Sequence, residues 1–168
     1  MKMPEKKRFT LGELIIVIAI LVLIAMMLLP GLCRPREKAR RVNCNANLKQ
    51  IGLALLMYSG DNYSGDSGGY FILTPSGNNF EPLNTLEIIN DSKVFGCPSA
   101  GLLKTTARNS NYLYGGSGIM DDNTNATTTT LAIDQSGNHP NNLWINALFV
   151  DGHVEGSKPD GTKTWNSN

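Results

Sequence analysis

The side chains best suited to metal binding or acid–base chemistry lie in the C-terminal part of the chain. His139 and His153 are the two histidines among the 168 residues, and Asp134 and Asp151 lie within five positions of one or the other. Imidazole and carboxylate groups bind metal ions and exchange protons, so these four residues form a possible metal or catalytic set. Asp151-Gly152 is also a typical turn sequence, and a structural role is the simpler interpretation.

Other motifs give no reason to expect an enzyme. The chain has no H-E-x-x-H sequence, and its Gly-rich stretch Tyr114–Gly118 lacks the Lys and the following helix that phosphate binding needs. The formal net charge is +1, which provides no general electrostatic reason for nucleic-acid binding. We therefore expect neither catalytic activity nor a nucleic-acid partner.

The N-terminal segment has the length and the apolar composition of a membrane anchor for the C-terminal part of the chain. Four basic side chains precede residue 9, and the largely apolar segment Phe9–Leu32 follows, with Glu13 near its start. As a helix its 24 residues would extend about 36 Å, enough to span a bilayer. A secretory signal would need small residues at a cleavage site, which are lacking, and a lipoprotein signal would need a small residue where Leu32 precedes Cys33. A plain signal anchor fits the length but leaves Glu13 unexplained.

The stretch "RFTLGELIIVIAI" resembles the prepilin signature of type IV pilins and type II secretion pseudopilins. The resemblance implies that a prepilin peptidase removes the leader 1–8 by cutting between Arg8 and Phe9, with N-methylation of Phe9. Glu13 then occupies the fifth mature position, and Pro30 lies near the kink that many such helices carry. Arg8 and Gly12 differ from the Gly and the aliphatic residue that the family usually has at these two positions.

An ionisable side chain in an apolar segment needs a partner. Under the prepilin interpretation, we expect Glu13 of one subunit to pair with the Phe9 amine of its neighbour, which would set the axial register of a filament. The alternative is that Glu13 lies in the lipid headgroup zone. The resemblance also implies an inner-membrane protein with one span, a cytoplasmic N-terminus and a periplasmic or extracellular C-terminal domain. Its expected partners are copies of itself, other pilin-like subunits, the prepilin peptidase and the assembly platform.

An amphipathic helix is predicted over residues 33–60. Leu48, Ile51, Leu55 and Tyr58 recur at helical spacing, with Val42 leading into the stripe. The helix should continue the membrane helix from Phe9, with bends at Pro30 and Pro35, because proline removes a backbone donor. The basic residues at its start more simply contact anionic headgroups than nucleic acid; they are Arg34, Arg36, Lys38, Arg40 and Arg41.

Two further stretches resemble a subgroup of these pilin-like proteins. Its members carry a Cys before Asn-Leu-Lys-Gln and a later Cys-Pro-Ser, which here involve Cys44 and Cys97. They also carry a His followed by nine residues and Asp-Gly, whereas eleven residues separate His139 from Asp151-Gly152 in this chain. In an exported domain, Cys44 and Cys97 are the natural disulfide pair and Cys33 remains alone. The alternative is that all three cysteines are reduced and packed.

The resemblance raises one cofactor possibility. Major pseudopilins of type II secretion hold calcium near their C-terminal loops, and Asp121, Asp122 and Asp134 could offer oxygen ligands. No EF-hand-like spacing is present, so we expect no metal or other cofactor, with calcium as the weaker alternative.

The predicted fold is α+β, with the long helix packed on a small antiparallel sheet formed by residues 61–168. Strands are predicted at Tyr70–Leu73, Tyr112–Tyr114, Thr128–Ile133 and Leu143–Val150, and Leu86–Ile89 is a strand or a helical turn. "ALFVDGHVEG" predicts a hairpin with a two-residue type I′ turn at Asp151-Gly152. The expected function is a filament subunit of a pseudopilus or pilus. The alternative is a monomeric, membrane-anchored module that uses Trp144 and Trp165 to bind a surface ligand such as a glycan.

Overall fold

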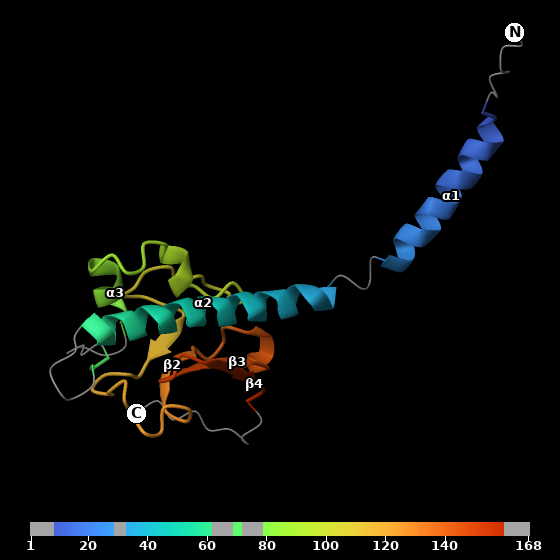
Figure 1. Cartoon of the computed structure of the whole chain (residues 1–168). Helices are drawn as coiled ribbons and strands as arrows, with labels where there is room; N and C mark the ends of the chain where they lie inside the picture. Colours follow the sequence, from blue (N-terminus) through green and yellow to red (C-terminus); the bar gives the residue numbers. More distant parts are fainter. Residues whose placement is uncertain (1–8, 29–32, 62–68, 72–78, 160–168) are drawn as a thin grey trace, which may run out of the picture. The chain divides into compact units, whose positions relative to one another are not determined.

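The structure, a computed structural model, describes residues 9–28, 33–61, 69–71 and 79–159 (Figure 1). The chain divides into two compact units, Met1–Lys38 and Ala39–Asn168. Helix α1 comprises Leu11–Leu28 and helix α2 comprises Cys33–Asp61. The predicted cleavage position at Arg8 and the predicted kink at Pro30 lie outside the described residues.

Helix α1 is apolar around its whole circumference. After Glu13 it contains only aliphatic residues, methionines and alanines, and every residue from Leu11 to Met27 is exposed. A helix with no polar face needs an apolar environment on all sides. Among the residues described, no helix combines the length and the apolarity required to cross a membrane.

From Ala39 onward, helix α2 is part of the C-terminal unit, and one face of it is buried against the rest of that unit. Cys44, Leu48, Ile51 and Leu55 follow one another at intervals of four, three and four residues, and all are fully buried. This confirms the predicted stripe from Leu48 to Leu55. Val42, by contrast, is 67% exposed, so the stripe begins at Cys44 and the predicted lead-in residue was wrong.

The sheet of the C-terminal unit confirms the predicted α+β class. Its four strands are antiparallel in the order β1-β2-β3-β4, and α2 lies across the sheet (Figure 1). The strands are β1 (Tyr112–Tyr114), β2 (Thr130–Asp134), β3 (Ile145–Phe149) and β4 (Val154–Ser157). Short helical segments connect them or precede them: α3 (Glu81–Thr85), η2 (Ser92–Phe95) and η3 (Pro140–Asn142).

One predicted strand differs from the structure, and the structure decides the alternative left open at Leu86–Ile89 in favour of a turn. Tyr70 forms only an isolated bridge with Met120, and the backbone N–H of Phe71 donates to Ile119 O at 3.0 Å; the rest of the predicted strand lies outside the described residues. Leu86–Ile89 forms a turn after α3, in which the N–H groups of Ile88 and Ile89 both donate to Leu83 O at 3.0 Å. Apolar content alone does not separate such a turn from a strand.

The β3–β4 connection is longer than predicted. The N–H of Gly152 donates to Phe149 O at 2.9 Å, and the N–H of Phe149 donates to His153 O at 3.0 Å, so the loop contains Val150, Asp151 and Gly152. Gly152 has φ +80°, but Asp151 does not have a positive φ. A type I′ turn requires positive φ at both central residues, so the predicted turn type was wrong although Gly152 does supply a left-handed position.

A glycine in α2 permits close contact between helix and sheet. A Cβ atom at Gly52 would lie 2.6 Å from Leu148 Cδ1, and Leu148 is fully buried in β3. We expect Gly52→Leu to lower the free energy of unfolding by about 2 kcal/mol through overpacking. Gly60→Leu is the matched control, because nothing lies within 4 Å of a Cβ at that position. Denaturant unfolding of the two variants measures the difference, and equal stability would contradict the packing argument.

Candidate functional site

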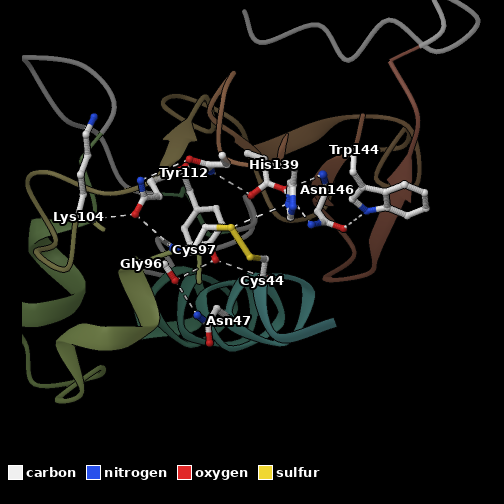
Figure 2. Close-up of a disulfide and its surroundings, with 12 residues drawn as sticks. Cys44, Asn47, Gly96, Cys97, Lys104, Tyr112, His139, Trp144 and Asn146 are labelled. Atoms are coloured by element: carbon white, nitrogen blue, oxygen red, sulfur yellow. Dashed lines mark hydrogen bonds and ion pairs between the residues drawn. A yellow bond between two sulfur atoms is a disulfide. The ribbon is translucent and has the colours of Figure 1, made fainter. Parts of the chain in front are cut away.

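The Cys44–Cys97 disulfide lies at the centre of the C-terminal unit. It joins α2 to the segment after η2, with the two Cα atoms 5.1 Å apart and both residues fully buried (Figure 2). The pairing is the one implied by the sequence resemblance. It closes a sequence separation of 53 residues and so links the helix covalently to the segment that follows η2.

A buried carboxylate and an imidazole lie beside this disulfide. His139 Nε2 is 3.2 Å from Asp134 Oδ2 and 3.9 Å from Cys97 Sγ (Figure 2). Asp134 Oδ2 also accepts hydrogen bonds from the backbone N–H and the side-chain amide of Asn146, at 2.8 and 2.7 Å. Both Asp134 and His139 are 2% exposed. Buried charge is tolerated only where such donors replace water, so this network is a fixed part of the fold.

Two asparagines extend the network to the backbone around Cys97. Asn111 Oδ1 accepts from the N–H groups of Cys97 at 3.2 Å and Lys104 at 2.8 Å. Asn138 Nδ2 donates to Asn111 O at 2.6 Å and to Asp134 Oδ1 at 3.4 Å. Sequence analysis did not identify Asn111, Asn138 and Asn146, because asparagine is common in turns and its residue type alone does not indicate a buried role.

Tyr112 connects the sheet to both cysteine segments. Its single O–H is shared between Gly96 O at 3.3 Å and Cys44 O at 3.4 Å, while Asn47 Nδ2 donates to the same Gly96 carbonyl at 2.8 Å. Burial, followed by the nearby charge of Asp134, raises the pKa of Tyr112 well above its ordinary value. The phenol therefore stays protonated and remains a donor over the physiological pH range.

Asp134 should be the most sensitive polar side chain of this unit. We expect Asp134→Ala to lower the free energy of unfolding by about 3 kcal/mol, because it leaves the buried donors of Asn146 and His139 without an acceptor. Asp122→Ala, at an exposed position, should change stability by less than about 0.5 kcal/mol. Denaturant titration of both variants tests this, and equal stability of the two would show that the carboxylate is not needed.

The other residues of the sequence-predicted sets lie elsewhere. His139 precedes β3 and Asp151-Gly152 follows it, so the strand separates the two halves of the His…Asp-Gly signature. His153 bonds to Asp151 through Nδ1 and stacks on Phe149 with ring centroids 4.2 Å apart. These contacts stabilise the hairpin loop. Among the described residues, the structure records no contact between either of these side chains and the Asp134–His139 pair.

The possible calcium ligands are not gathered into one site. Asp134 is buried in the network just described, while Asp122 is exposed and the N–H of Asp121 donates to Gly69 O at 2.9 Å. In the part of the chain that the structure describes, one group of three potential metal ligands is close enough to share an ion. That group is Cys44, Cys97 and His139, whose ligand atoms lie within 4.8 Å of one another.

Glu13 has a partner within its own chain. Its Oε2 accepts from the backbone N–H of Thr10 at 2.9 Å and from the Thr10 hydroxyl at 2.8 Å. The Thr10 Oγ1 in turn accepts from the N–H of Glu13 at 3.3 Å. This reciprocal pattern is a capping box at the start of α1, which sequence reasoning missed although Thr-x-x-Glu is its signature.

Trp144 offers only a small surface site. The Arg41 guanidinium carbon lies 4.9 Å from the centroid of the indole ring, and Trp144 Nε1 donates to Asn146 Oδ1 at 3.0 Å. A shallow hollow of about 160 Å³ adjoins these residues. Trp165, the other tryptophan considered for ligand binding, lies outside the described residues.

The sequence also contains a hydrolase-like motif that the sequence analysis did not identify. Gly65–Gly69 reads Gly-Asp-Ser-Gly-Gly and so matches G-x-S-x-G, the pattern of a nucleophile elbow. Such an elbow connects a strand to a helix, whereas this stretch follows α2 and precedes the isolated bridge at Tyr70. Ser67 itself lies outside the described residues, so the motif carries no catalytic assignment.

A comparison with protein families gives a match over part of the chain. Residues 34–64 match a family described as "Protein of unknown function (DUF1559)", and the matched segment contains most of α2 with Cys44. We found no match among curated proteins and none among solved structures.

Proposed function

We propose that this chain is a pilin-like structural subunit that assembles into a pseudopilus or a pilus-like filament. A prepilin peptidase removes residues 1–8, and the mature chain polymerises through Phe9–Leu32 and displays its C-terminal domain outside the inner membrane. The observation that carries this proposal is α1, a helix without a polar face whose side chains are exposed from Leu11 to Met27. Lipid before assembly and other copies of the helix afterwards would provide the apolar surroundings it needs.

Three other features agree with this proposal. The α+β unit packs α2 on an antiparallel sheet, which is the arrangement that the prepilin resemblance implies. The family match over residues 34–64 falls on that helix. The disulfide and the buried polar network stabilise the unit, as is expected of a domain that serves as a building block.

Cross-linking through α1 tests assembly. Ile15→Cys and Ile24→Cys place two thiols nine residues apart, hence on opposite faces of a helix with about 3.6 residues per turn. In a Cys33→Ser background, each chain carrying both cysteines can link to two neighbours. Oxidation in membranes that contain a prepilin peptidase should then produce ladders of multimers, and intact mass should show loss of residues 1–8.

The competing function is a membrane-tethered monomer that binds a surface ligand, and the Arg41–Trp144 hollow is the feature that favours it. That protein would give monomers and sparse dimers in the same cross-linking experiment. If the double-cysteine chain is found in the membrane fraction but oxidation produces no ladder of multimers, filament assembly is excluded.

A further inference from the structure

We propose that Cys44, Cys97 and His139 form a metal site when the disulfide is reduced, and that the site takes a thiophilic divalent ion such as Zn²⁺. The sulfur and nitrogen atoms of these side chains already lie within 4.8 Å of one another in the oxidised protein. Two thiolates and one imidazole are a typical donor set for Zn²⁺, with Zn–S near 2.3 Å and Zn–N near 2.1 Å.

The observed distances suit a tetrahedral ion. Such an ion would hold a thiolate and an imidazole nitrogen about 3.6 Å apart, and a nitrogen and a carboxylate oxygen about 3.3 Å apart. In the structure, Cys97 Sγ is 3.9 Å from His139 Nε2, and Asp134 Oδ2 is 3.2 Å from the same nitrogen. Asp134 contacts His139 but does not belong to the group of three whose ligand atoms lie within 4.8 Å of one another, so the proposed site has three protein ligands.

The two sulfur atoms must separate for this site to form. Reduction breaks the S–S bond, and rotation of both cysteine side chains can bring the sulfur atoms to the separation of about 3.8 Å that a shared Zn²⁺ requires. The Cα atoms are 5.1 Å apart, so this change needs rotation about the side-chain bonds and no displacement of α2. Binding releases two thiol protons.

Burial determines how the site would be loaded. Both cysteines are fully buried and His139 is 2% exposed, so an ion enters while the reduced unit folds and not through an open channel. The same burial excludes water from the completed site and leaves the ligands little freedom to move away. The metal and the disulfide are thus two alternative links between the same helix and the same segment.

Oxidation would replace the metal link between Cys44 and Cys97 by the disulfide. A disulfide oxidant accepts two electrons, and its own S–S bond breaks to give two thiols, which take up two protons. The Cys44–Cys97 bond forms and Zn²⁺ leaves. Reduced chains would therefore keep α2 fixed to the Cys97 segment before oxidation, with the metal as the linking group.

Cobalt binding provides the direct test. The full-length protein is unfolded, reduced by a phosphine without oxygen, and refolded into detergent micelles in the presence of increasing Co²⁺, because the buried site takes up its ion during folding. We expect one equivalent to bind with thiolate-to-cobalt charge-transfer bands and the visible bands of a tetrahedral ion, and Zn²⁺ to displace it. Absence of the charge-transfer bands would refute the site.

Variants identify the ligands. Cys44→Ser and His139→Gln should weaken Co²⁺ binding at least about tenfold, whereas Cys33→Ser and His153→Gln, the matched controls, should bind as the wild type does. Unchanged binding in His139→Gln would remove histidine from the site and overturn the proposal.

A measurement on the wild type covers the case in which a variant does not fold. One equivalent of Zn²⁺ should raise the Tm of the reduced protein and leave that of the oxidised protein unchanged, because a ligand stabilises only the state that binds it. If Zn²⁺ changes the Tm of the reduced and the oxidised protein by the same small amount, the proposal is wrong. Filament assembly plays no part in these readouts, so the proposed function can fail while this site stands.

Discussion

Glu13→Gln is expected to lower the yield of filaments at least about tenfold, which corresponds to about 1.4 kcal/mol of assembly free energy per subunit contact. Under the proposed function, cleavage before Phe9 would create a free amine, and the Glu13 carboxylate of a neighbouring subunit would be its partner in an apolar setting. An unpaired charge in such a setting is strongly unfavourable. Filaments sheared from cells and quantified by immunoblot measure the effect.

Glutamine at this position separates the assembly role from the capping role. The capping box accepts Gln as well as Glu, so Glu13→Gln removes the charge and keeps the bonds to Thr10. Thr10→Ala is the matched variant, because it removes the cap and keeps the carboxylate, at a helix stability cost of about 1 kcal/mol. We expect filaments from Thr10→Ala near the wild-type level. Normal assembly of Glu13→Gln, or an equal loss in Thr10→Ala, would assign Glu13 to the helix end alone.

Removing the disulfide should cause the largest loss of stability in the C-terminal unit. The Cys44–Cys97 bond closes a separation of 53 residues, and the chain-entropy relation for such a loop gives about 4 kcal/mol. We expect the double variant Cys44→Ser/Cys97→Ser to lose about that amount in denaturant unfolding of the detergent-solubilised protein under metal-free conditions. Cys33→Ser should leave the unfolding midpoint unchanged.

The oxidation state can be checked without any variant. Alkylation of the unfolded, unreduced protein should modify Cys33 alone, and reduction beforehand should expose two further thiols. If Cys44 and Cys97 are alkylated without a reductant, the stability loss expected for the double serine variant has no basis.

Much of the fold followed from local patterns. The buried face of α2 lies where helical spacing predicts it, because that period reflects which side of a helix faces the core. The strands β1, β2 and β3 lie at the short apolar runs that predict them. The wrong predictions concern Val42 and the Asp151-Gly152 turn, where the outcome depends on contacts that the local sequence does not specify. Val42 has the right residue type but lies ahead of the packed face, and Asp151-Gly152 occurs in both two-residue and three-residue hairpin loops.

The polar network could not be predicted in the same way. Asn111, Asn138 and Asn146 lie in three separate segments, and only the folded chain brings their amides to Asp134 and to the backbone around Cys97. An asparagine in a turn and an asparagine in a buried network look alike in sequence. The difference is the set of partners, which comes from residues distant along the chain.

By itself, the sequence determined the apolar character of α1, the position of Glu13 in it, the cysteine pair implied by the resemblance and the α+β class. Tertiary structure alone decided that His139 lies beside Cys97, 42 residues away along the chain, and that Asp134 is shared by His139 and Asn146. The reason is physical. Helix and strand periods are encoded by neighbouring residues, whereas a site is formed by side chains whose sequence separation the chain must first close.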